Sequence, residues 1–312
     1  MTQMGQVTHM IQKPLTILTV AMLAACGSGV AQERKTALPK NFDSPEAAVQ
    51  ALIDATSKND SAELAAVLGS NGRGILTSGD ASRDQAERRE FAQLASARHR
   101  LERSAMKAGT MILVVGEQDW PFPVPLVSAG QRWHFDAGLG ALEVRARRVG
   151  ANELDAIEIC AGYVEAQQAF AAGHRSGAAT MEYARAIVGA AGQKNGLYQP
   201  GASPELVPQG FADAAVETPG RKAKPYHGYY FRVLTEQGPN APGGSHKYVA
   251  GKFMIGGFGL AAWPAEYGVT GVHTFIVNQD NTVYEKDLGA QTSTLAPALV
   301  RYDPDSSWTP VD

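Results

Sequence analysis

A stretch of alternating apolar and turn-forming residues between Tyr226 and Gly289 constrains the fold of this chain more than any other feature. Its runs of Tyr, Phe, Val and Ile are separated by Gly, Pro, Asn and Asp, a pattern that predicts an antiparallel meander. The four runs are Tyr226–Thr235, Lys252–Trp263, Val272–Val277 and Thr282–Lys286. Both alternating faces of the third run are largely apolar. We therefore expect a central strand covered on both sides, with a helix on one of them.

The N-terminal residues are of a different kind. Lys13 is the only charged residue before Cys26, and Pro14–Ala25 is an apolar run that contains two threonines. This run is shorter than the roughly 20 residues that span a bilayer, and it is typical of a signal-peptide core. It ends in Leu23-Ala24-Ala25-Cys26-Gly27, which resembles the lipobox of bacterial lipoproteins, in which the Cys is acylated and becomes the mature N-terminus. An ordinary secretory signal with a Cys near its cleavage site is the alternative.

The lipobox predicts where the protein resides. We expect residues 1–25 to be a lipoprotein signal peptide, Cys26 to be lipidated, and residues 26–40 to form a flexible tether. The protein would then be anchored in the cell envelope and face the periplasm, with an envelope protein as a potential partner; secretion is the alternative. Gly27 after the Cys resembles lipoproteins sent to the outer membrane of a Gram-negative cell. A net charge of -3 with 19% charged residues predicts no nucleic-acid partner.

Residues 41–150 are expected to form an N-terminal α+β domain. Capping residues predict helices that begin at Ser44, Asp60 and Ser82. Strands are expected at Met111–Val115 and Gln131–Phe135, whereas three prolines restrict Trp120–Leu126 to an extended edge. Helices followed by a small sheet resemble the cone-like nuclear transport factor 2 fold. Because such folds commonly enclose small ligands, a candidate pocket would contain Trp120, Trp133, His134 and Asp136.

Residues 151–312 are expected to combine a long helix with the meander, which completes an α+β fold. The pattern predicts a helix over Ala141–Val149, an interruption at Gly150, and a longer helix over Glu153–Ala171 capped by Asn152. Its apolar stripe would be Leu154, Ile157, Ala161 and Val164. Another helix is expected at Met181–Ala190. Cys160 is interpreted as a buried, inert thiol.

Sequence motifs of common catalytic and cofactor sites are absent. The chain has no Gly-x-Ser-x-Gly, His-Glu-x-x-His, P-loop or Cys-x-x-Cys motif. We therefore name no catalytic residue, cofactor or metal. His227 and His273 both lie on the meander and would converge if their strands were neighbours, although structural histidines are the favoured interpretation. Trp263 and Tyr267 are candidates for a ligand groove, with core packing as the alternative.

Four segments together resemble the bacterial family called domain of unknown function 2950. They are Asn152–Ile157, Gly196–Tyr198, Tyr226–Phe231 and Trp263–Val272. The resemblance implies a secreted or lipid-anchored envelope protein. The second half is also similar to the heads of type IV pilins and type II secretion pseudopilins, in which a long helix lies across an antiparallel meander. A lipobox replaces the pilin cleavage site here, and His174–Ala179 lacks the acidic Ca²⁺ loop of some relatives.

Two classes of function follow from these features. The first is a non-enzymatic envelope lipoprotein whose pilin-head-like second half serves binding or assembly. The second is a periplasmic small-ligand-binding protein or hydrolase that uses the N-terminal pocket. The sequence favours the first, because it combines a lipobox with a sheet that carries no catalytic motif.

Overall fold

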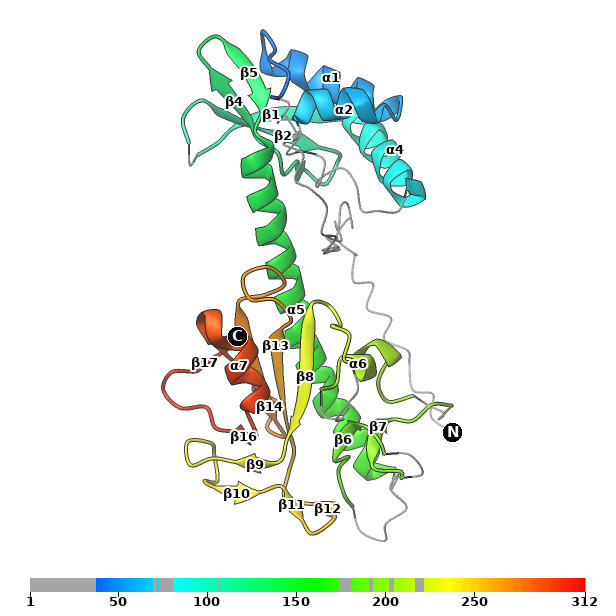
Figure 1. Cartoon of the computed structure of the whole chain (residues 1–312), viewed down its shortest axis with the longest axis vertical. Helices are drawn as coiled ribbons and strands as arrows, with labels where there is room; N and C mark the ends of the chain where they lie inside the picture. The colour runs from blue at the N-terminus through cyan, green and yellow to red at the C-terminus, as the bar shows by residue number, and fades with distance from the viewer. Residues whose placement is uncertain are drawn as a thin grey trace, which may run out of the picture. The chain divides into compact units, whose positions relative to one another are not determined.

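The structure is a computed structural model that describes residues 38–69, 72, 81–105, 107–173, 181–190, 193–201, 205–216 and 222–311. Figure 1 shows helices together with several antiparallel sheets, which confirms the α+β class. The chain separates into two compact units, divided between Ala146 and Arg147. Each unit has its own core and is described by itself.

Unit 1 begins with helices and continues into a small sheet. Its helices are α1 (Pro45–Ser57), α2 (Ser61–Leu68) and α4 (Ala81–Ala97). The strands are β1 (His99–Arg103), β2 (Thr110–Val115), β3 (Trp120–Pro121), β4 (Leu126–Ala129) and β5 (Arg132–Phe135), in the order β1-β2-β4-β5 with β3 paired to β2. Two of the three expected caps are present, since the Ser44 hydroxyl accepts from the Ala47 N–H and the Asp60 carboxylate accepts from the N–H groups of Ala62 and Glu63. The third is wrong, because α4 begins at Ala81, one residue before Ser82. The strands β1 and β4 were not predicted.

One helix, α5 (Ala137–Ala172), replaces the two that the sequence predicted. Gly150 does not interrupt it, because a glycine inside a long helix costs only about 1 kcal/mol relative to alanine. The prediction of Leu154 in the apolar stripe is also wrong, since its side chain is 69% exposed. The buried face runs through Ala156, Cys160 and Tyr163, roughly half a turn away from Leu154.

The predicted meander is the main sheet of unit 2, and its antiparallel strand order is β17-β15-β14-β13-β8. Of the predicted run Lys252–Trp263, only the part from Gly259 onward belongs to it, because Phe253 and Met254 pair in a separate hairpin. The strands are β8 (Tyr229–Leu234), β13 (Gly259–Pro264), β14 (His273–Asn278), β15 (Tyr284–Asp287) and β17 (Thr309–Pro310). The central position of β14 was predicted from its two apolar faces. Both faces are covered, as expected.

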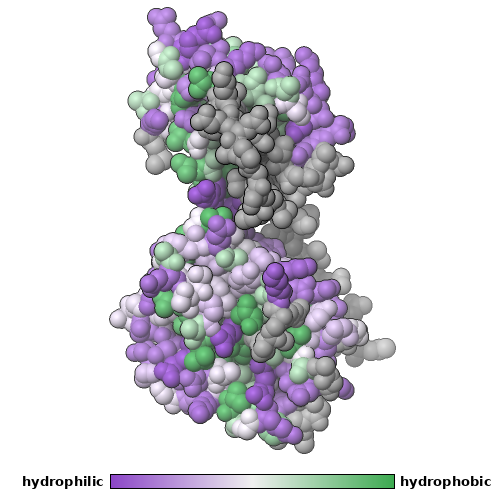
Figure 2. All heavy atoms as spheres, viewed as in Figure 1, coloured by the Kyte–Doolittle hydropathy of each residue, from purple (hydrophilic) through white to green (hydrophobic). Residues whose placement is uncertain are grey.

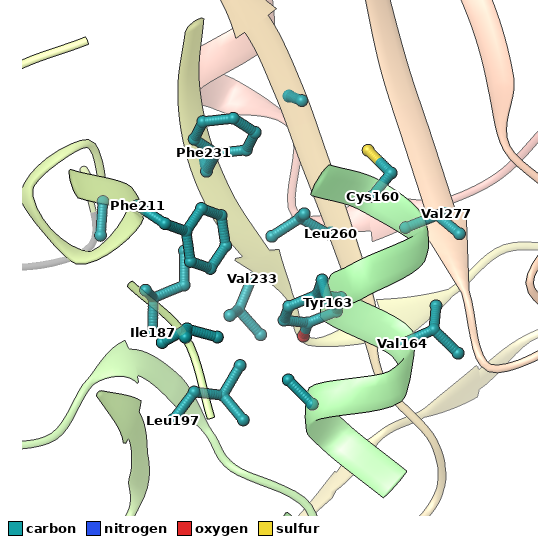
Figure 3. Close-up of a cluster of buried hydrophobic side chains, with 14 of the residues drawn as sticks. Cys160, Tyr163, Val164, Ile187, Leu197, Phe211, Phe231, Val233, Leu260 and Val277 are labelled. Atoms are coloured by element: carbon teal, nitrogen blue, oxygen red, sulfur yellow. The ribbon is translucent and has the colours of Figure 1, made fainter. Parts of the chain in front are cut away.

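The helix α5 covers one face of this sheet (Figure 1). Figure 3 shows Cys160, Tyr163 and Val164 of this helix among side chains of the strands and of the 181–216 segment. Cys160 is fully buried, as predicted, and burial raises the pKa of its thiol to about 12. On the other face, Trp263 and Ile276 pack with Ala296 and Tyr302 of the C-terminal segment.

The segment 181–190 is extended, so the predicted helix Met181–Ala190 is wrong. It contains β6 (Ala186–Val188), which pairs in parallel with β7 (Gly196–Tyr198). The Tyr183 N–H donates to the Met254 carbonyl at 2.8 Å. The side-chain amide of the buried Gln167 in α5 accepts a hydrogen bond from the Ala184 N–H and donates one to the Ala184 carbonyl. It therefore satisfies the backbone of Ala184 as a neighbouring strand would. These tertiary hydrogen bonds override the helical pattern.

Short elements complete unit 2. They are α6 (Gln209–Asp213), β9 (Glu236–Gln237), β10 (His246–Lys247), β11 (Val249–Ala250), β12 (Phe253–Met254), η2 (Gly289–Gln291), α7 (Thr292–Leu295), η3 (Ala296–Ala298) and β16 (Arg301–Tyr302). β11 and β12 form a small hairpin, while β9 lies between β10 and β16. No helix among the described residues combines the length and apolar character that a membrane span requires.

Candidate functional site

Three segments that are distant in the sequence meet at one end of the unit 2 sheet. They are Asn152–Asp155 of α5, the turn Tyr226–Tyr229 before β8, and the loop Ala265–Val272 between β13 and β14. We call this region the junction. These residues belong to three of the four segments that carry the family resemblance described above.

Glu153 fastens α5 to the start of β14. Its Oε1 accepts hydrogen bonds from the backbone N–H groups of Val272 at 2.7 Å and His273 at 3.0 Å. The Nδ1 of His273 lies 3.3 Å from both carboxylate oxygens. The Glu153 side chain is only 18% exposed, so these charge-assisted bonds are shielded from water. Glu153 therefore fixes the position of His273.

Asp155 holds the second histidine of the junction. Its Oδ2 lies 2.6 Å from Nδ1 of His227, and both side chains are partly exposed. Residues two positions apart on a helix point to different sides. Asp155 and Glu153 can consequently engage two separate segments, the hairpin turn and the start of β14.

The turn that carries His227 has an unusual backbone. Tyr226 and Tyr229 exchange two N–H···O bonds of 3.0 Å, and the two residues between them have positive φ, 48° at His227 and 77° at Gly228. Positive φ at both central residues is the geometry of a type I′ hairpin, which favours Asn or Gly over His. A Cβ at position 228 would lie 2.4 Å from Nδ2 of Asn152. Gly228 is required here by both its conformation and this close approach.

Asn152 and Thr270 complete the junction. The Asn152 amide donates to the Thr270 carbonyl at 2.8 Å. The Thr270 hydroxyl accepts from the Glu266 N–H, so the loop is tied to itself and to α5. The backbone of this loop also bonds to the turn, because the Ala265 N–H donates to the Gly228 carbonyl at 2.9 Å. Hydrogen bonds thus connect all three segments of the junction to one another.

The two carboxylates of the junction determine how the imidazole rings of His227 and His273 are oriented. In each, Nδ1 faces a carboxylate, so a neutral ring places its proton on Nδ1 and leaves the Nε2 lone pair available. This tautomer suits a hydrogen-bond acceptor, a proton acceptor or a metal ligand. Within the described part of the chain, however, no group of three or more His, Cys, Asp or Glu is arranged to hold a metal ion.

Of the four candidate residues that the sequence placed on the meander, three lie in the junction and one is buried in the core. His227 and His273 are not on neighbouring strands, because β13 lies between β8 and β14. Trp263 is buried on the opposite face of the sheet from α5. Tyr267 lies in the junction loop, partly exposed, with its hydroxyl donating to Asp287 at 3.2 Å. His227, His273 and Tyr267 therefore belong to the junction, whereas Trp263 belongs to the core.

The four candidate residues of unit 1 occupy different environments. Trp120 and Trp133 pack against the core, where Phe122 contacts Phe91 and Phe135 ring to ring. His134 follows Trp133 on β5 and so points to the other face of the sheet. Asp136 caps α5, with its carboxylate accepting from the Leu139 N–H at 3.0 Å.

Sequence reasoning missed the carboxylates of the junction. Asn152, Glu153 and Asp155 were assigned to a helix cap and a family motif, without a partner. Their spacing from the histidines is 72 residues for Asp155 and His227 and 120 for Glu153 and His273, so no local pattern could pair them. Cys26 and the loop His174–Ala179 lie outside the described residues.

Comparison with known proteins gives one family. A family model described as "Protein of unknown function (DUF2950)" matches residues 39–311. No curated protein matches the chain, and no solved structure does.

Proposed function

The chain belongs to the DUF2950 family of proteins of unknown function, and from that premise we propose a lipid-anchored protein of the bacterial cell envelope that acts by binding another envelope protein. The Leu23–Gly27 lipobox supports the anchor, with Cys26 as the acylated residue. Several acyl chains hold a protein to a membrane far more firmly than a single chain does. The two units would then face the periplasm.

The junction is the observation that carries the binding role. It presents Leu154, His227 and Tyr267 at the surface on a backbone that hydrogen bonds fix from three sides. Leu154 lies between Glu153 and Asp155, the two residues that fasten α5. Exposed apolar and aromatic side chains on a rigid support are typical of protein-binding surfaces, because little conformational entropy is lost when they are covered. A long helix on an antiparallel meander, the arrangement similar to pilin heads, supports an assembly role as well.

The anchor is tested by intact mass and membrane fractionation of the native protein beside the Cys26→Ser variant. We expect acyl chains and membrane association for the wild type, and a soluble, unmodified chain for the variant. Two soluble, unmodified chains would refute the anchor.

The binding surface is tested separately by placing a photo-crosslinking residue at position 267 or, as a control, at position 295. Leu295 is similarly exposed but lies in α7, outside the three segments of the junction. A defined crosslinked band at 267 that Leu154→Ser abolishes is the expected result. Equal crosslinking at both positions would exclude the junction as the binding surface.

A second candidate function uses unit 1 as a small-ligand-binding or hydrolytic domain. Thr110 and His134 flank Val127 in one cross-strand row, and each has a buried polar atom, Oγ1 or Nδ1, without a hydrogen-bond partner among the described residues. Unpartnered buried polar atoms are costly unless a water or ligand satisfies them. Thermal-shift screening of small polar ligands tests this, with stabilisation lost in His134→Leu as the expected result and no stabilising ligand as the contrary one.

A further inference from the structure

The hairpin β11–β12 lies at one end of unit 2 (Figure 1) and carries exposed apolar residues. Phe253 is 38% exposed and Ile255 is 52% exposed, while Met254 between them is fully buried. Ile255 directly follows β12, so the buried Met254 lies between two exposed apolar residues. Met181, which precedes the Tyr183–Met254 bridge, is exposed as well. We call Phe253 and Ile255 the apolar tip.

A polar pocket lies beside this tip. It is open, has a volume of about 220 Å³, and is lined by Glu236, Gln237, Ser245, His246, Lys247 and Arg301. Backbone hydrogen bonds make the pocket and the tip contiguous. The N–H groups of Ile255 and Gly256 both donate to the Tyr248 carbonyl at 3.0 Å, and Nε2 of His246 lies 3.1 Å from the Gly256 carbonyl.

The charges around the tip are mainly positive. Lys252 lies over the Phe253 ring at 5.1 Å, Lys247 lines the pocket, and Arg185 donates to the Lys252 carbonyl. Neither lysine ammonium is paired with a carboxylate among the residues that the structure describes. The nearby acids include Glu236, which is paired with Arg301 at 2.9 Å, Glu182, whose Oε2 is buried, and Asp280, which acts electrostatically on Tyr248. This end is therefore cationic, although the whole chain carries a net charge of -3.

We propose that this end of unit 2 docks onto an anionic lipid bilayer. The apolar tip enters the interface between headgroups and acyl chains, Lys247 and Lys252 contact lipid phosphates, and the pocket receives one anionic headgroup. Exposed aromatic and aliphatic side chains flanked by lysines suit such an interface, because long cationic side chains keep their charge in the headgroup layer while their stems cover apolar surface. Figure 2 shows hydrophobic residues, in green, among hydrophilic ones on the surface of the unit that carries this hairpin.

This docking is independent of the lipid anchor, and the test separates the two. The chain from position 26 onward, with Cys26→Ser, lacks both the apolar leader and the acylation site, yet it keeps the whole family match of residues 39–311. Its partitioning is measured by flotation with vesicles of phosphatidylcholine, alone or mixed with phosphatidylglycerol, at low and high salt. We expect binding only to the mixed vesicles, weakened by salt.

Variants in the same background locate the contact. Phe253→Ser with Ile255→Ser is expected to lower partitioning about tenfold or more, because two partly inserted apolar side chains are lost. Lys247→Gln with Lys252→Gln should abolish the preference for phosphatidylglycerol. Leu295→Ser, which removes an apolar side chain of similar exposure in α7, should change neither property.

A spectroscopic variant does not depend on the folding of the serine variants. In Ile255→Trp, the indole emission is expected to shift to shorter wavelength when mixed vesicles are added. Failure of the Cys26→Ser chain to bind mixed vesicles, equal binding by the tip and Leu295→Ser variants, or an unchanged emission would each overturn the proposal.

Discussion

Glu153 is the residue on which the junction depends most, and replacing it with alanine tests that role. The substitution removes the acceptor of two backbone N–H bonds, from Val272 at 2.7 Å and His273 at 3.0 Å, together with the carboxylate beside the His273 ring. The N–H groups would be left without a protein partner in a region where Glu153 itself is mostly buried.

The expected loss follows from these contacts. Hydrogen bonds to a charged group contribute about 1.5–3 kcal/mol each, and water that enters the vacated space recovers part of that amount. We expect Glu153→Ala to lower the free energy of unfolding by about 2–4 kcal/mol. For a unit of this size, that corresponds to a fall in Tm of about 5–15 °C. Glu153→Gln retains an oxygen acceptor, so about half of this loss is expected.

Hydrogen–deuterium exchange of the Val272 and His273 amides provides the local measurement, alongside thermal unfolding. These amides should exchange much faster in Glu153→Ala, whereas the amides of β13 should change less. Glu165→Ala is the matched control, since Glu165 is an exposed carboxylate of the same helix. If both variants gave the same Tm and the same exchange at 272–273, Glu153 would not fasten α5 to β14.

Four further predictions concern unit 2. Gly228→Ala and Gly268→Ala both place alanine at positive φ, but only position 228 lacks space for the added methyl group. We expect thermal unfolding to show that the free energy of unfolding falls by about 1–2 kcal/mol at position 268 and by clearly more at position 228. Equal losses would contradict the close approach of Gly228 to α5. The Cys160 thiol should resist Ellman's reagent at about pH 8 until the protein unfolds, and rapid labelling would contradict its burial. Burial raises the pKa of this thiol to about 12, above the unfolded value of about 9. The stabilising contribution of the neutral thiol is therefore complete below pH 9 and is lost as the pH rises toward 12. Denaturation at several alkaline pH values measures this loss. Ending the chain at Gly289 removes the C-terminal segment that covers Trp263, so the Trp263 fluorescence should shift to longer wavelength. An unchanged emission would show that this segment does not cover Trp263.

The sequence by itself determined the features that depend on local pattern. Alternation of apolar residues located β8, β13, β14 and β15, because side chains of a strand point to opposite faces in turn. The two apolar faces of β14 also placed it at the centre of the sheet. Ser44 and Asp60 marked the starts of α1 and α2, because an N-cap satisfies backbone groups within one turn.

Only the tertiary structure decided which distant groups meet. The continuity of α5 through Gly150 and the outward position of Leu154 depend on what the helix packs against. The extended segment around Ala184 is held by Gln167 and Met254, whose hydrogen bonds outweigh a local helical preference. The junction is the clearest case, since the packing of α5 on the sheet brings Asp155 within 2.6 Å of His227, 72 positions further along the chain. Periodicity and capping act over a few residues, whereas such contacts arise only when whole elements pack.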